Sequence, residues 1–124
     1  MMTYKEKANS IEKTLKAYFD GIYNGDVQKL KSTFTHNAYL YGDVKGEVAV
    51  KSVEDYLTGV ENRKSPKDLG ETFQMEILSI EILGKVAMAK LHVPMLGFNY
   101  YDLLSLSLVN GEWKIVNKLF THVA

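Results

Sequence analysis

Residues 100–122 read YYDLLSLSLVNGEWKIVNKLFTH, two apolar-rich stretches on either side of Asn110-Gly111. An Asn-Gly pair between such stretches is typical of a two-residue type I′ turn joining antiparallel strands. That turn fixes a register, whose pairs are Val109–Glu112, Leu108–Trp113, Leu106–Ile115, Leu104–Asn117 and Asp102–Leu119. One face of this hairpin is therefore predicted to be apolar except for Asp102 and Asn117.

Composition favours a single globular domain over residues 1–124. The 124 residues are 46% hydrophobic and 24% charged, which is enough apolar material for one core. Fifteen basic and fifteen acidic side chains cancel, so no basic surface is expected to attract nucleic acid. The N-terminus lacks a signal-peptide pattern, and no apolar run approaches the roughly 20 residues of a membrane span. With no cysteine, these features predict a cytoplasmic protein with neither a nucleic-acid nor a membrane partner.

The first third of the chain is expected to be helical, and two short strands and a third helix follow it. From Tyr4 onward, apolar residues recur at the spacing of one helix face, at Ala8, Ile11, Leu15, Tyr18, Phe19 and Ile22. Asn24-Gly25 predicts the end of that helix, and Asp26 is suited to cap a short second one. Residues 38–44 and 47–51 show the alternation of strands. Ser52 then opens a predicted third helix.

The second half is predicted to be β-structure. A hairpin with its turn at Gly84-Lys85 is expected to place on one face the pairs Ile82–Ala87, Ile80–Ala89 and Leu78–Leu91. The opposite face of that hairpin is mixed, with Met88, Lys90 and His92. Helices followed by long antiparallel strands predict an α+β fold in which helices cover one face of a curved sheet.

Four segments resemble the NTF2-like (SnoaL-like) superfamily, and in particular its subset named "putative lumazine-binding". They are YFDGIYNGD, FTHNA, ILSIEILGKVAMAKL and DLLSLSLVNGEWKIVNKLF, which occur in the family's order across nearly the whole chain. One departure is Leu103, since the family pattern usually has an aromatic residue after the strand aspartate. The resemblance implies a cone-shaped sheet around a cavity roofed by helices, and a homodimer formed through the outer sheet face.

Tyr18 and Asp102 are the candidate catalytic residues. In ketosteroid isomerase, another member of the superfamily, a first-helix tyrosine and a protonated strand aspartate form an oxyanion hole, and Tyr18 and Asp102 resemble these two. A carboxyl buried in an apolar site can also act as a general base. The isomerase's own base would fall near Gly42, with Asp43 on the opposite parity, which argues against that reaction. The alternative is structural: Asp102 pairs with a backbone amide, a lysine or Asn117.

Aromatic residues suggest that the cavity holds a small aromatic or apolar ligand. The predicted ligand-binding residues are Tyr18, Phe34, Tyr41, Tyr56, Tyr100, Asp102 and Asn117. The three histidines lack the close spacing of a metal-binding motif, so no metal site is predicted, and the sequence identifies no cofactor.

Three functions remain open from the sequence. The chain is either a homodimeric small-molecule-binding domain, or a proton-transfer enzyme of isomerase, dehydratase or cyclase type that uses Asp102 with Tyr18 or His36, or an assembly module that meets a partner through its outer sheet face. The surface assigned to that third function is the mixed face, with Met88, Lys90, Leu103, Lys118 and Phe120.

Overall fold

The computed structural model describes residues 2–124, beginning with the long helix α1 (Tyr4–Asn24). Thr3 caps its N-terminus in a capping box with Glu6, and Gly25 ends it with φ of 68°. Because glycine adopts this left-handed conformation without a steric penalty, the helix stops where the sequence predicts. Of the six predicted core positions in this helix, five are buried: Ile11, Leu15, Tyr18, Phe19 and Ile22.

Two shorter helices follow at the positions that the sequence predicts. The Asp26 side chain accepts a hydrogen bond from the Lys29 amide and caps α2 (Val27–Lys31). Ser52 does the same for α3 (Val53–Asn62), accepting from the Asp55 amide. The buried face of α3 consists of Val53, Tyr56, Leu57 and Val60. Both helices are therefore held by a polar cap at one end and by apolar burial along one side.

Six strands form one sheet in the order β2-β1-β6-β5-β4-β3. Their bounds are β1 Phe34–Val44, β2 Glu47–Ser52, β3 Glu76–Leu83, β4 Val86–Met95, β5 Phe98–Val109 and β6 Glu112–His122. β1 and β6 run parallel, and the other neighbouring pairs run antiparallel. This parallel pairing is possible because α3 and four strands lie between β1 and β6 in the chain.

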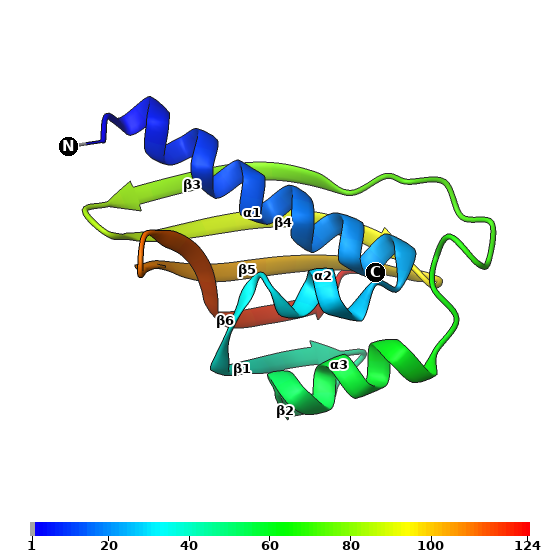
Figure 1. Ribbon diagram of the computed structural model, residues 1–124. Helices are drawn as coiled ribbons and strands as arrows, with labels where there is room; N and C mark the ends of the chain where they lie inside the picture. The colour runs from blue at the N-terminus through cyan, green and yellow to red at the C-terminus, as the bar shows by residue number, and fades with distance from the viewer. Residues whose placement is uncertain (1) are drawn as a thin grey trace.

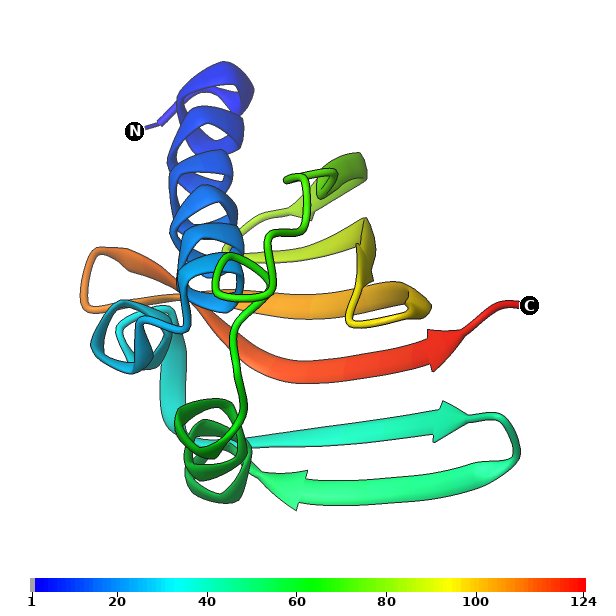
Figure 2. The same cartoon turned by 90° about the vertical axis from the view of Figure 1, so that its right-hand side faces the viewer.

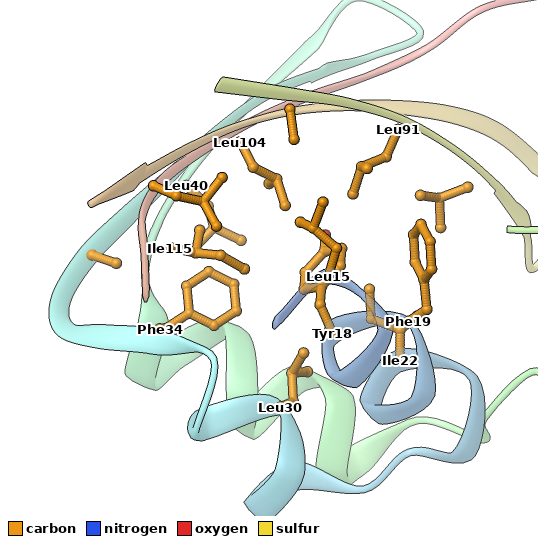
Figure 3. Close-up of a cluster of buried hydrophobic side chains, with 14 of the residues drawn as sticks. Leu15, Tyr18, Phe19, Ile22, Leu30, Phe34, Leu40, Leu91, Leu104 and Ile115 are labelled. Atoms are coloured by element: carbon orange, nitrogen blue, oxygen red, sulfur yellow. The ribbon is translucent and has the colours of Figure 1, made fainter. Parts of the chain in front are cut away.

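The three helices lie on one side of the curved sheet, α1 over β3 and β6, and α3 over β1 and β2 (Figure 1). The β1–β2 hairpin projects away from the helices (Figure 2). Between the helices and the sheet, apolar side chains from both layers point toward one another, among them Leu15, Phe34 and Leu104 (Figure 3). The predicted α+β fold, with helices packed on a strongly curved sheet, is confirmed.

The β5–β6 register agrees with the prediction near the turn and departs from it further along. Val109–Glu112, Leu108–Trp113 and Leu106–Ile115 pair as predicted. The next pair is Ser105–Asn117, so Val116 is an extra residue in β6, which is the signature of a β-bulge. Beyond it Leu104 pairs with Lys118, and Asp102 pairs with Phe120. The predicted pairings of Asn117 with Leu104 and of Leu119 with Asp102 are wrong.

The β3–β4 hairpin shows the same kind of departure. Ile82–Ala87 and Ile80–Ala89 pair as predicted, but the register shifts at Leu78, and Ile77 takes the place opposite Leu91. Leu78 is therefore exposed instead of packing in the core. In both hairpins the prediction is correct near the turn and fails after one irregular residue.

Among the described residues, no helix is long and apolar enough to span a membrane.

Candidate functional site

A small pocket of about 100 Å³ lies between the sheet and the end of α3. Strand residues contribute its floor, and α3 with the residue that follows it contributes its cover. Its walls are Leu40, Lys51, Tyr56, Arg63, Val93, Met95, Tyr100, Asp102, Lys118 and Phe120. The apolar lining with a few charged groups is the usual composition of a small-molecule site.

Asp102 is the innermost charged group of this pocket, with only 2% of its surface exposed. The Tyr18 hydroxyl donates a 2.6 Å hydrogen bond to Asp102 Oδ2. The Lys118 ammonium lies 3.9 Å from the same oxygen and is almost equally buried. A buried carboxylate needs compensating partners, and here it has a phenol donor and a cation.

Aromatic rings surround the Lys118 ammonium. It lies 4.5 Å from the Tyr56 ring centroid and 5.3 Å from those of Tyr18 and Phe120. Its hydrogen bond to the Tyr56 hydroxyl is long, at 3.4 Å. Because cation–π contacts place the ammonium without using all three of its N–H donors, Lys118 retains hydrogen-bonding capacity toward the pocket.

Tyr18 is fixed in its neutral, proton-donating form. Burial raises its pKa well above the usual value near 10, and the negative charge of Asp102 raises it further. At neutral pH the phenol therefore donates to the Asp102 carboxylate. In the isomerase arrangement both groups donate to a substrate oxyanion, whereas here the Tyr18 hydroxyl donates to Asp102 itself.

Three of the seven predicted ligand-binding residues line this pocket: Tyr56, Tyr100 and Asp102. Tyr18 does not line the pocket, but it contacts two residues that do, Asp102 and Lys118. Phe34 lies in the core, with its ring edge-on to those of Tyr18 and Tyr56 at centroid distances of 6.0 Å.

Two predicted ligand-binding residues are on the wrong face of the sheet. Tyr41 is 46% exposed, because Leu40 takes the inward position and its neighbours alternate outward. Asn117 is turned outward by the bulge, and its side-chain amide donates to the Tyr39 carbonyl at 3.2 Å. Lys118 takes the inward position instead, so the prediction of Lys118 and Phe120 on the outer face is also wrong.

Gly42 occupies the inner-face position at which the isomerase would have its base. A Cβ atom added to Gly42 would come within 2.2 Å of the Phe120 ring, so this ring fills the space that a carboxylate would need. Asp43 is exposed and accepts a hydrogen bond from the Gly46 amide in the β1–β2 turn. The geometry therefore gives no support to steroid-type isomerisation.

Arg63, Lys51 and Lys118 are the charged pocket residues that sequence reasoning missed. Arg63 follows α3 in a loop without periodicity, so no pattern assigns it to a face. For Lys118 a signal was present: a buried Asp102 requires a cation, and Lys118 is the lysine nearest to it on the paired strand. That requirement would have indicated a one-residue bulge.

The histidines lie outside the pocket. His36 is exposed on β1, and His92 and His122 both bond to Asn99 near the β4–β5 turn. Within residues 2–124, no three histidine or acidic side chains come together in a way that could hold a metal ion.

A larger, shallow groove of about 620 Å³ lies on the outer face of the sheet. Side chains that are partly or largely exposed line it, including Tyr41, Val48, Leu78, Leu103 and Leu119. Its volume is greater, but it holds no buried charged group. The inner pocket is therefore the better candidate for ligand recognition, and the outer groove is better interpreted as part of a contact surface.

Helices roofing a curved sheet over a pocket define an NTF2-like domain, and solved structures share this fold. A protein of unknown function from Shewanella baltica OS155 is 23% identical, covers 100% of this chain and 99% of its own, and superposes with a TM-score of 0.88. One from Methylobacillus flagellatus KT is 25% identical over 99% and 96% of the two chains, with a TM-score of 0.87. One from Silicibacter pomeroyi DSS-3 is 23% identical over 98% and 100%, with a TM-score of 0.85.

The chain belongs to the family described as "Putative lumazine-binding", whose model matches residues 6–121. This confirms the resemblance that the four sequence segments indicate. No curated protein matches the chain in sequence.

Proposed function

We propose that this chain is a small-molecule-binding domain that takes its ligand into the inner pocket. The observation that carries this proposal is the buried Asp102–Lys118 pair in a pocket wall that is mostly aromatic and apolar. An apolar core of equal volume would be at least as stable, so a charged pair beside a cavity is better explained by recognition than by stability.

The volume of the pocket restricts what part of a ligand enters it. The pocket measures about 100 Å³, whereas pockets that enclose a drug-sized ligand measure about 300–1,000 Å³. A bicyclic ring of the lumazine type is too large to enter completely. The pocket suits a small metabolite, or the polar end of a larger one whose remainder extends past Tyr100 and Phe120.

Native mass spectrometry of the freshly purified protein, followed by thermal-shift measurements with a metabolite panel, tests this function. We expect a retained mass or a stabilising compound, with Asp102→Asn weakening the response at least tenfold. The matched control is Tyr41→Phe, which alters an aromatic residue on the outer face. If no compound stabilises the wild type and no mass is retained, the binding function is wrong.

The outer sheet face favours a second, compatible role as the interface of a homodimer. Leu103 and Leu119 are paired across β5 and β6, and both remain more than a third exposed. Val48, Leu78 and Met88 extend this apolar surface. Exposed apolar area of this extent is typical of a protein contact, and the face suits a second copy of the chain.

Analytical ultracentrifugation tests the homodimer. Leu103→Glu would place a charge at the centre of this face, and it is expected to shift the mass from two chains to one. Tyr4→Glu, on the exposed side of α1, is the control and should leave the mass unchanged. A wild-type protein that sediments as one chain at all concentrations would contradict the dimer.

A further inference from the structure

The pocket contains more positive than negative charge. Lys51, Arg63 and Lys118 line it together with one acidic residue, Asp102. Lys118 is the cation nearest to Asp102. Within residues 2–124, neither Arg63 nor Lys51 forms an ion pair with a carboxylate. The pocket therefore has two cations beyond the one that its own acid neutralises.

Arg63 lines the pocket, and two of its guanidinium nitrogens have no partner among the described residues. It follows the last residue of α3 with an extended backbone, at φ −105° and ψ 160°. Its Nε and Nη2 atoms are shielded from solvent and make no hydrogen bond to any described residue. These two nitrogens form the side of the guanidinium that binds both oxygens of a carboxylate at once. A buried donor without an acceptor is unfavourable, so this edge is suited to an acceptor from outside the chain.

The pKa of Tyr100 shows which charges act inside the pocket. Burial raises its pKa, whereas the positive charges of Arg63 and Lys118 act in the opposite direction. Both cations therefore act on the same wall of the pocket. Negative charge placed beside Tyr100 is favoured by both of them.

The size and the lining of the pocket restrict the class of ligand that it can bind. The pocket has room for a carboxylate and a few carbon atoms. Leu40, Val93 and Met95 provide an apolar wall for the carbon atoms. The Nε–Nη2 edge of an arginine can bind two oxygens of a carboxylate or of a phosphate, and the apolar wall favours an anion that carries carbon atoms.

We propose that the pocket binds a small organic carboxylate, held by the Nε–Nη2 edge of Arg63 and by the Lys118 ammonium. The apolar part of the ligand contacts the pocket wall, and Lys51 at the rim attracts the anion from solvent. This inference rests on the proposed binding function and specifies its ligand class.

The test compares acids with amides of the same shape on the full chain. Butyrate is paired with butyramide and phenylacetate with phenylacetamide, and binding is followed by amide chemical-shift changes in NMR titrations. We expect each acid to bind at least tenfold more tightly than its amide, with the largest shifts at Tyr56, Arg63 and Tyr100. Inorganic phosphate should bind more weakly than the acids.

Arg63→Gln should weaken acid binding at least tenfold and leave amide binding nearly unchanged. The matched control is Lys64→Gln, which removes the same charge from the next, exposed residue and should not alter acid binding. If Arg63→Gln does not fold, Arg63→Lys keeps the charge without the planar edge and should still lose most of the preference for acids.

The outcomes separate this inference from the function on which it rests. If amides or neutral panel compounds bind in the pocket as tightly as the acids, the carboxylate assignment is wrong and the binding function stands. If Lys64→Gln weakens the binding of the acids as much as Arg63→Gln does, the acids are attracted by the general surface charge and the carboxylate assignment is wrong. If no compound of any charge binds, both fail.

Discussion

The two halves of the β5–β6 hairpin face the same interior with different chemistry. Between the Asn110-Gly111 turn and Val116, the inward pairs are apolar, as in Leu106 with Ile115. Beyond Val116 the inward residues include Asp102 and Lys118. The turn-proximal half closes the core, and the turn-distal half opens into the pocket.

The bulge at Val116 separates these two halves. An extra residue changes which side chains of β6 point inward after it, so Lys118 replaces Asn117 opposite Leu104. One inserted residue thus converts a wall with an amide into a wall with a cation. A local irregularity in the strand therefore places Lys118 beside Asp102 in the pocket.

Within the turn-distal half, loss of the cation should have the largest effect on stability. Lys118→Met leaves the Asp102 carboxylate buried without its cation, which is expected to cost about 3 kcal/mol in the free energy of unfolding. Adding Asp102→Asn should recover at least about 1 kcal/mol of that loss, because the amide that replaces the carboxylate is neutral and still accepts from Tyr18. Urea denaturation measures both values.

The turn-proximal half supplies the control for this rescue. Leu106→Ala should cost about 2–5 kcal/mol through an apolar cavity. Ile115→Ala, on the paired residue, should not recover any of it. If the Asp102 and Lys118 substitutions also show no recovery when combined, the two residues are not an ion pair in solution.

A steric contact in the turn-distal half should give the next largest effect. Gly42→Ala places a methyl group against the Phe120 ring, and overpacking of this kind is expected to cost about 2 kcal/mol. Phe120→Leu in the same chain should relieve much of this cost. The control is Gly59→Ala in α3, where no atom lies within 4 Å, and which is expected to stabilise the helix slightly. An equal response at both glycines would contradict the packing of Phe120 over Gly42.

Most of the fold was predictable because its signals are local. The helix face of α1, the Gly25 end and the Asn110-Gly111 turn depend on residues within a few positions of one another. Strand parity was predictable until the first bulge, because periodicity carries no marker for an extra residue. Asp102 was therefore placed correctly, being on the strand without the extra residue, whereas Asn117 was not.

The candidate site was less predictable than the fold for a physical reason. Its charges come from elements that are distant in sequence, with Arg63 after α3 and Lys118 near the end of β6. Only the requirement that a buried carboxylate have a counterion connects Asp102 to Lys118 before the structure is known. No comparable requirement identifies Arg63, since its partner is not within the chain.

At alkaline pH, the dependence of stability on pH should reveal the contribution of the buried Tyr18 hydroxyl, which donates to Asp102 in the turn-distal half. The folded-state pKa of Tyr18 is raised, so this phenol stabilises the fold fully below pH 10 and loses that contribution as pH rises through the folded pKa. Above pH 10, wild-type stability should fall by up to about 1.4 kcal/mol per pH unit more steeply than that of Tyr18→Phe. Urea denaturation between pH 9 and 11 measures the slopes. Identical slopes in wild type and Tyr18→Phe would mean that Tyr18 is not buried against Asp102.

The smallest effect on stability should come from Asn117, which a β5–β6 register without a bulge would place in the pocket. Asn117→Ala removes only a 3.2 Å hydrogen bond to the Tyr39 carbonyl at the exposed side of the sheet, so it should cost less than about 0.5 kcal/mol. It should also leave the binding of pocket ligands unchanged, in contrast to Asp102→Asn. If Asn117→Ala weakens binding as strongly as Asp102→Asn does, β6 in solution has no bulge at Val116 and Lys118 faces outward. Because one residue decides between the two registers, this near-silent variant is the most direct test of how the turn-distal half acquires its charge.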